Sequence, residues 1–228
     1  MSPIKLLLAS TNRGKLREFR QAALERHFIV EQVPQIDALP PCVEDGRTFD
    51  ANARKKALHY AALVEGLIFA DDSGISVEAL DGAPGVYSAR FSGPGATDDS
   101  NNEKLIFELR RKTAGSNAHG ALRVPIDAAP FSGFPAHYVC VIVAAQGQRI
   151  RTVVEGRCDG VVIETPRGRG GFGYDPYFFY PPLGKTFAEI TASEKFAVSH
   201  RGLAFRKFLA TLGAAVRQRR ADGCPPGT

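Results

Sequence analysis

Residues 67–93 read LIFADDSGISVEALDGAPGVYSARFSG, and the start of this stretch organises the interpretation of the whole chain. Residues 67–70 form a short apolar run that is typical of a buried strand. Asp71 and Asp72 follow at once, so we expect them at the carboxyl end of that strand, where open α/β sheets bind ligands. Adjacent carboxylates repel each other, so the pair is costly without a cation or a cationic partner between them. The residues alone leave open a catalytic site and a solvated turn.

The composition is that of a soluble globular protein. Of the 228 residues, 44% are hydrophobic and 23% are charged, which allows a sizeable core. We predict one two-lobed domain over residues 1–220 and a disordered tail over 221–228. The net charge of +5 favours an anionic ligand. No run of five or six like charges indicates a nucleic-acid-binding tail, so we expect no nucleic acid partner.

The cysteines and the apolar runs predict a cellular location. No two cysteines form a C-x-x-C pair, so a zinc site is not expected. The apolar run at the N-terminus is too short for a signal-peptide core, and no run approaches the length of a membrane span. We therefore expect a cytoplasmic protein with reduced thiols and no membrane partner.

A second candidate site lies near the N-terminus. Residues 4–9 predict a strand and the spacing after position 15 predicts a helix, so residues 10–15, STNRGK, form the turn between them. Such a turn offers free backbone N–H groups and a positive dipole end to a phosphate, and Lys15 adds a charge. Capping of the helix by residues 10–12 explains the pattern equally well. A P-loop is excluded because Leu16 stands where it requires Ser or Thr.

Acidic residues also precede a helix predicted from about Thr48 to Val64. Glu44 and Asp45 either stabilise the N-terminus of that helix or reach toward the acidic pair as metal ligands. Lys56 lies one helical turn beyond Asn52, beside the apolar face.

The remaining elements are read from periodicity and turn residues. Strands are predicted over 138–145 and 152–163, joined by a hairpin turn, and a further helix begins at 97–103. Residues 113–134 lack periodicity and are expected to form a long surface loop. The last helix is predicted over 202–220, with Ser199 as a plausible cap.

Residues 168–173, GRGGFG, match the pattern G-x-G-x-x-G. A dinucleotide-binding fingerprint is excluded, because three prolines in residues 174–182 prevent the helix that must follow. The loop either presents the rings of Phe172 and Tyr174 for stacking on a base or packs Phe172 in the core.

Two basic residues at the start of the last helix are unusual. Cations there oppose the helix dipole, so His200 and Arg201 suggest a nearby anion or carbonyl-bearing ligand. A structural role for a lone histidine is the alternative. Together with Lys195, Lys15 and the acidic residues, these groups can hold a triphosphate, a divalent ion and a planar base.

Six motifs in collinear order, from Ile4 to Leu212, make the chain similar to the inosine triphosphate pyrophosphatase family, also called XTP/dITP diphosphatases. They are ASTNRGK at 9–15, the segment from Glu44 through Asn52-Ala53 and Lys56-Ala57, ADDSG at 70–74, GAPGVYSAR at 82–90, GFGYDP at 171–176 and SHR at 199–201. The resemblance implies a mixed α/β fold, with a central sheet flanked by helices and two lobes around a nucleotide-binding cleft, usually in a homodimer. It implies Mg²⁺-dependent hydrolysis of ITP, dITP and XTP to the monophosphate and pyrophosphate, which cleans the nucleotide pool.

The resemblance also assigns roles to residues at matching positions. Asp72 is implied as the general base, and Glu44 and Asp72 as the residues near Mg²⁺, with Asp71 as a possible helper. Phe172 is expected to stack on the base, and His200 and Arg201 to recognise the 6-oxo edge of the purine. The substrate-binding set is Ser10, Thr11, Asn12, Arg13, Gly14, Lys15, Lys56, Ser73, Phe172, Gly173, Tyr174, Asp175, Lys195, His200 and Arg201.

Two other functions compete with this one. A related pyrimidine-directed pyrophosphatase would use UTP or dTTP but not ITP. A non-catalytic nucleotide- or RNA-binding module would bind tightly without turnover, but it has no evident use for three carboxylates near phosphates.

Overall fold

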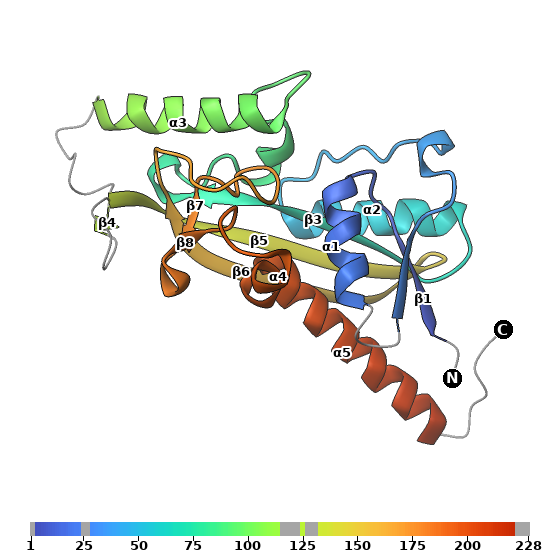
Figure 1. Cartoon of the computed structure of the whole chain (residues 1–228). Helices are drawn as coiled ribbons and strands as arrows, with labels where there is room; N and C mark the ends of the chain where they lie inside the picture. The colour runs from blue at the N-terminus through green and yellow to red at the C-terminus, as the bar shows by residue number, and fades with distance from the viewer. Residues whose placement is uncertain (1–2, 24–27, 115–123, 126–131, 222–228) are drawn as a thin grey trace.

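A computed structural model of the chain describes residues 3–23, 28–114, 124–125 and 132–221 (Figure 1). An eight-stranded sheet runs in the order β2-β1-β3-β5-β6-β7-β8, with β4 paired beside β5. β1 is parallel to β2 and to β3, and the other pairs are antiparallel. The predicted mixed α/β fold is therefore confirmed. The strands are β1 Ile4–Leu8, β2 Phe28–Gln32, β3 Ile68–Val77, β4 Val124–Pro125, β5 Ser132–Gln146, β6 Arg149–Val162, β7 Phe178–Tyr180 and β8 Lys185–Thr186.

The helices follow the predicted order along the chain. Thr48 accepts a hydrogen bond from the backbone of Ala51 and caps α2, so both predicted ends of this helix are confirmed. Among the described residues, no helix is long and apolar enough to span a membrane. The helices are α1 Arg13–Ala23, α2 Phe49–Leu63, α3 Asp98–Ala114, α4 Ala192–Val198 and α5 His200–Ala221, and the short 3₁₀ turns are η2 Ile36–Ala38, η3 Glu78–Leu80, η4 Gly85–Arg90 and η5 Pro181–Leu183.

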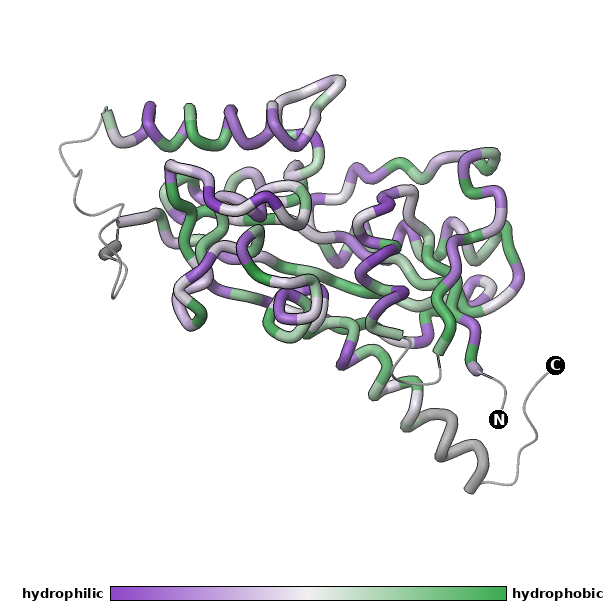
Figure 2. The backbone as a smooth tube through the Cα atoms, viewed as in Figure 1, coloured by the Kyte–Doolittle hydropathy of each residue, from purple (hydrophilic) through white to green (hydrophobic). Residues whose placement is uncertain are grey.

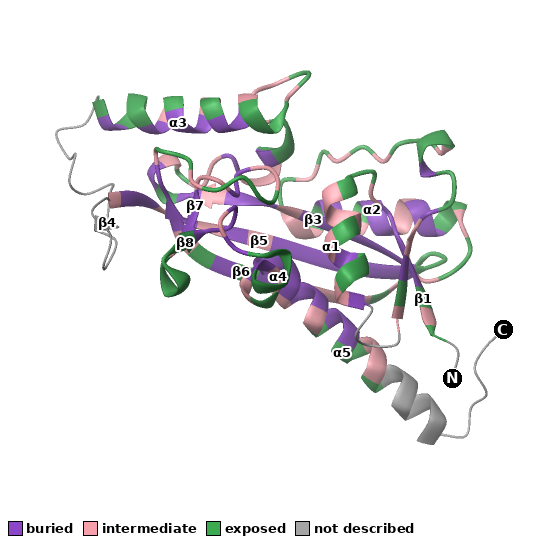
Figure 3. Cartoon of the chain, viewed as in Figure 1, coloured by how far each residue is buried: buried purple, intermediate pink, exposed green. Residues whose placement is uncertain are grey.

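Helices cover both faces of the central strands. On one face, Phe19 of α1 and Phe205 of α5 pack around Phe69 of β3 in an edge-to-face and tilted aromatic cluster. On the other face, Ala53 and Ala57 of α2 are fully buried, and their small side chains let the helix lie close to the sheet. Hydrophobic residues follow the central strands, which are the most buried part of the molecule (Figures 2 and 3).

A third core cluster lies at the other end of the long strands, under α3. Leu105 and Leu109 of α3 pack there with Phe134 of β5 and Phe178 of β7. Phe134 and the buried Thr113, which closes the last turn of α3, fall inside the predicted 113–134 loop. That prediction is wrong at both ends, because small residues and prolines hide the start of β5. The middle of the loop, at 115–123 and 126–131, lies outside the described residues, as does the predicted tail beyond Ala221.

The position of the acidic pair differs from the prediction. β3 does not end at Ala70 but continues to Val77, so Asp71 and Asp72 lie in mid-strand, paired with Ile142 and Val141 of β5. Consecutive side chains of a strand point to opposite faces. The two carboxylates therefore point to opposite faces of the sheet, and the positive charges of Lys15 and Lys56 act on both of them.

The neighbouring strand explains how a ligand can nevertheless reach Asp72, although Asp71 is fully buried. β1 pairs with β3 only at Leu7–Ile68 and Leu8–Phe69, and then the chain turns away into α1. The edge of β3 is therefore open on the β1 side only over about residues 71–73, because Ser88 and Ala83 bond to the backbone of Ile75 and Val77 farther along the strand. Ligands bind at the carboxyl ends of parallel strands in such folds. The strand whose carboxyl end lies at the expected ligand site is therefore β1, and not β3 as predicted.

Candidate active site

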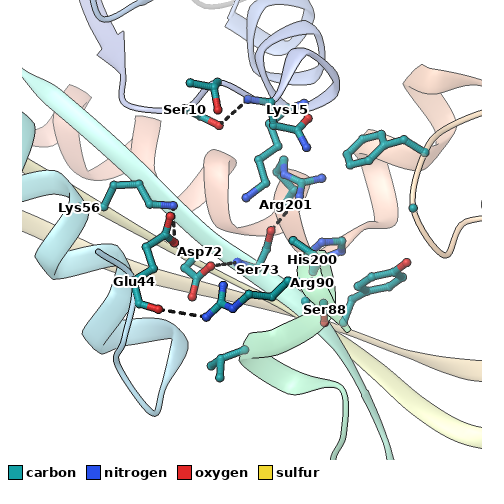
Figure 4. A pocket seen from close by; sticks show the side chains of 18 of the residues that line it. Ser10, Lys15, Glu44, Lys56, Asp72, Ser73, Ser88, Arg90, His200 and Arg201 are labelled. Carbon is teal, nitrogen blue, oxygen red and sulfur yellow. Dashed lines mark hydrogen bonds and ion pairs between the residues drawn. The ribbon is translucent and has the colours of Figure 1, made fainter. Parts of the chain in front are cut away.

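A pocket of about 460 Å³ opens at this edge (Figure 4). Its size is typical of small-molecule sites. It brings together most of the residues predicted from the sequence, drawn from segments that lie far apart in the chain. Its lining includes Ser10, Thr11, Asn12, Lys15, Glu44, Lys56, Asp72, Ser73, Phe172, Gly173, Tyr174, Asp175, Lys195, His200 and Arg201.

The turn before α1 combines the two alternatives left open by the sequence. The side chain of Asn12 accepts a hydrogen bond from the backbone N–H of Lys15 at 3.0 Å and so caps the helix. Ser10 accepts one from the N–H of Asn12 at 3.2 Å. Both residues also line the pocket together with Lys15. Capping thus holds the turn in the conformation that presents a helix N-terminus to the pocket.

Two predicted residues of this turn do not line the pocket. Arg13 is exposed, and its side chain does not reach the cavity. Gly14 acts through its lack of a side chain: a Cβ there would lie 2.9 Å from the ring of Phe172. The glycine thereby lets the aromatic loop approach α1.

Asp71 points toward α1 and α5. It is fully buried, 2.9 Å from Nζ of Lys15 and 3.7 Å from the guanidinium of Arg201, and it accepts a hydrogen bond from Ser73 Oγ at 3.1 Å. Burial alone would raise the pKa of this carboxyl, but the charges of Lys15, Arg201 and Lys56 outweigh it and lower the pKa to about 2. Asp71 is therefore ionised and holds Lys15 and Arg201 in place, but it does not itself line the pocket.

Asp72 points to the opposite face, toward α2, and lines the pocket. Its carboxylate accepts hydrogen bonds from Nδ2 of Asn52 and from the backbone N–H of Ser73, each at 3.1 Å. Burial raises its pKa above the ordinary value despite the opposing charges of Lys56 and Lys15. A carboxylate with a raised pKa and a fixed orientation is suited to accept a proton. Asn52, which orients it, was absent from the predicted site; its spacing from Lys56 was the available signal.

Glu44 and Lys56 form the wall beside Asp72 (Figure 4). Oε2 of Glu44 lies 2.7 Å from Nζ of Lys56, which also donates a hydrogen bond to the backbone oxygen of Asp71 at 3.2 Å. Burial opposes the charge of Lys56, but Glu44 and Asp71 together raise its pKa. Arg90 of η4 donates to the backbone oxygen of Glu44 at 3.0 Å and so ties this loop across the cleft.

Glu18 does not line the pocket, but it holds two of the cations that do, and the sequence interpretation missed it. Its two carboxylate oxygens lie 2.9 Å from Nζ of Lys195 and 2.6 Å from Nη1 of Arg201. Burial works against its charge, but Arg201 and Lys195 outweigh it and lower the pKa of Glu18. Its spacing of three residues from Lys15 on one helix face was the available signal. Lys195 is also paired with Asp175, so this lysine is held from two sides.

We expect Glu18→Gln to destabilise the protein by about 2 kcal/mol at neutral pH, because Lys195 and Arg201 then lose a buried counter-charge. Thermal unfolding of both proteins measures this. The contribution is present above the ordinary glutamate pKa and is lost as pH falls through the lowered one, so the difference should shrink in acid. Glu31→Gln is the matched control, since its ion pair with Lys5 is exposed (55% and 46%). Equal melting temperatures for Glu18→Gln and Glu31→Gln would contradict the assignment.

His200 corrects one part of the prediction. It was expected as a cation at the start of the last helix, but burial and the charges of Arg201, Lys195 and Lys15 lower its pKa well below the ordinary value. The imidazole is therefore neutral. It stacks on Tyr138 with centroids 4.4 Å apart, and its buried Nδ1 has no hydrogen-bond partner among the described residues. Arg201 is balanced by Glu18 and Asp71 rather than by a missing anion.

The glycine loop carries an aromatic ring to the pocket rather than to the core. Phe172 is only half-buried, with its ring centre 4.6 Å from Nζ of Lys195 and 5.4 Å from Cζ of Arg201. Its backbone N–H donates to Asp175 at 2.8 Å, and the buried Tyr174 donates its hydroxyl hydrogen to the backbone oxygen of Ser88 at 2.8 Å. As predicted, no helix follows the loop, and the chain enters β7.

Comparisons with known proteins agree over nearly the whole chain. A model of the Ham1 family matches residues 6–211. A dITP/XTP pyrophosphatase of Desulfotalea psychrophila is 42% identical over 205 residues, covering 90% of this chain and 83% of its own. Two solved structures are similar: the Ham1 protein of Staphylococcus aureus (TM-score 0.74, 32% identity) and a HAM1 protein of Coxiella burnetii (TM-score 0.76, 31% identity). Each covers 92% of this chain and 99% of its own.

Proposed function

This chain belongs to the Ham1 family, as its motifs predicted, and on that premise we propose that it hydrolyses ITP, dITP and XTP to the nucleoside monophosphate and pyrophosphate. Removal of these deaminated purine nucleotides protects the nucleotide pool. The observation that carries the proposal is the placement of Asp72. The carboxyl group of Asp72 has a raised pKa and an orientation fixed by Asn52. It lines a pocket that is also lined by several cationic side chains and by an aromatic loop.

The cationic wall suits a triphosphate. The turn at residues 10–15 offers backbone N–H groups, and Lys15 and Lys56 supply positive charge on either side of the open β3 edge. Hydrolysis between the α and β phosphates requires a water in line with phosphorus and neutralisation of the leaving pyrophosphate. In our proposal Asp72 accepts the proton of that water, while Asn52 keeps the carboxylate aimed.

Glu44 and Asp72 are the residues we propose to hold Mg²⁺. The negative charge of Glu44 contributes to the raised pKa of Asp72, so the two carboxylates repel each other within one pocket. Mg²⁺ binds through one or two carboxylates plus phosphate oxygens, and this donor set fits that preference. Within the described residues no group of three or more His, Cys, Asp or Glu is placed to hold a metal ion. When bound, the ion neutralises phosphate charge.

The purine base is proposed to bind between the glycine loop and α5. The half-buried ring of Phe172 provides a stacking surface, and Gly173, Tyr174 and Asp175 shape the pocket around it. Neutral His200 and the guanidinium of Arg201 offer donors for O6 of hypoxanthine or xanthine. These donors would face another donor at the amino group of adenine, which rejects ATP.

The test is a substrate panel of ITP, XTP, dITP, ATP, GTP and UTP with Mg²⁺ at mildly alkaline pH, with pyrophosphate and orthophosphate measured separately. We expect IMP and pyrophosphate from ITP, with ATP nearly untouched. Guanine shares O6 with hypoxanthine, so an equally low rate with GTP would place its rejection at the 2-amino group. Preference for UTP or dTTP would favour a pyrimidine-directed enzyme. Tight binding of ITP without turnover would favour a non-catalytic module.

We also propose a cytoplasmic homodimer, on the basis of the family resemblance. Among the described cysteines, Cys42, Cys140 and Cys158 are free thiols. Light scattering coupled to size-exclusion chromatography measures the mass: we expect twice the 24.6 kDa of one chain.

A further inference from the structure

The first turns of α3 hold Gly173 through both of its backbone polar groups. The backbone N–H of Gly173 donates to Oδ2 of Asp98 at 2.7 Å, and its carbonyl oxygen accepts from Nδ2 of Asn102 at 3.0 Å. Gly173 adopts a φ of 62°, which favours glycine. The loop is therefore fixed at the residue directly after Phe172, by side chains more than 70 positions away in the chain.

The same helix end also holds the opposite wall of the pocket. Asn101 accepts a hydrogen bond from the backbone N–H of Ser92 at 2.8 Å and donates to the oxygen of Ala89 at 3.3 Å. Ala89 and Ser88 line the pocket, and Ser88 receives the hydroxyl hydrogen bond of Tyr174. The N-terminal part of α3 therefore joins η4 to the glycine loop.

α3 is fixed in position by the hydrophobic core on which it packs. Leu105, Ile106 and Leu109 are buried in the core cluster beneath it, and only its outer face is exposed (Figure 3). Asn101 and Asn102 are buried as well, whereas Asp98 reaches from the exposed rim of the pocket. A side chain on a rigid helix positions its partner better than one on a loop.

We propose that Asp98 and Asn102 are positioning residues for the purine base: by holding Gly173 they fix the ring of Phe172 against Lys195 and Arg201. This inference rests on the proposed function and deepens it, because it assigns control of base affinity to α3. Neither residue acts on the phosphates. Loss of the contact therefore weakens binding of the base and leaves the chemical step intact.

The test compares steady-state hydrolysis of ITP by wild type, Asp98→Ala and Asp98→Asn. The alanine variant loses the acceptor for the Gly173 N–H, so we expect KM to rise roughly five-fold with kcat changed less than two-fold, about the effect of one hydrogen bond. The asparagine variant keeps an acceptor oxygen without the charge, so its KM should return to near the wild-type value. Asp99→Ala removes the adjacent exposed carboxylate and is the matched control; it should behave as wild type.

Two further readouts separate positioning from a general effect of charge. Inorganic tripolyphosphate, which has no base, should inhibit wild type and Asp98→Ala with the same inhibition constant. In a Phe172→Ala background, Asp98→Ala should add little, because the ring on which it acts is gone. A parallel rise in the tripolyphosphate constant, or an undiminished effect without Phe172, would overturn the inference.

The outcomes also separate this inference from the proposed function. Wild type that releases pyrophosphate from ITP, with an Asp98→Ala variant of unchanged KM, contradicts the inference alone. Wild type that releases none contradicts the proposed function and the inference built on it.

Discussion

Asp72→Asn should lower kcat for ITP by about a thousand-fold, which is the typical contribution of a positioned general base. Asparagine keeps the size of the side chain and its hydrogen bond from Ser73, but it cannot accept the proton of the attacking water. Steady-state kinetics with Mg²⁺, followed by pyrophosphate release, measures the loss.

Stability provides a second readout for the same variant. Burial raises the pKa of Asp72, so the folded protein carries this charge at a cost. Its neutral replacement should therefore leave the melting temperature unchanged or raise it. Asp45→Asn is the matched control, since this exposed carboxylate pairs with Lys55 and should be dispensable for turnover. Asp72→Asn with most of its activity retained would contradict the role of Asp72.

Asp71→Asn should greatly reduce the stability of the fold, whereas Asp72→Asn should not. The variant leaves Lys15 and Arg201 without the fully buried charge that they share. Breaking such a buried pair costs about 3 kcal/mol, or roughly 6–12 °C in melting temperature for a chain of this size. Activity should fall as well, because Lys15 and Ser73 lose the group that holds them. Thermal unfolding of both proteins at neutral pH measures the difference in stability.

The stability difference between wild type and Asp71→Asn should depend on pH. The folded pKa of Asp71 is about 2 and its ordinary value is 3.8. Its stabilising contribution is therefore complete above the ordinary value and is lost as pH falls toward 2. The gap between wild type and Asp71→Asn should narrow over that range. Asp159→Asn, which removes an exposed ion pair with Arg157, is the control and should shift stability by less than about 1 kcal/mol. A gap that is constant with pH would mean that the charge of Asp71 is not what stabilises the fold.

Much of the site could be predicted because its residues follow strand ends and turns. Local patterns singled out the STNRGK turn and the Glu44 loop but left their roles open, and the collinear motifs supplied those roles and the fold class. The interpretation of β3 failed because a polar pair after four apolar residues looks like the end of a strand. Ile75 and Val77 resume the apolar pattern, and this was the signal for a continuing strand.

Other parts of the site depend on contacts that no local pattern reports. The neutral state of His200 follows from its complete burial beside three cations. Asp98 looks like an ordinary acidic residue in the first turn of a helix, and its bond to Gly173 joins residues 75 positions apart. Glu18 was hidden in the same way, because its two partners come from α4 and the start of α5.

A water activated at Asp72 is proposed to attack the α-phosphorus of a deaminated purine nucleotide. Hydrolysis of ITP in ¹⁸O-enriched water, with mass spectrometry of both products, identifies the phosphorus that is attacked. We expect the label in IMP and none in pyrophosphate. Label in pyrophosphate, or release of orthophosphate in its place, would rule out this attack.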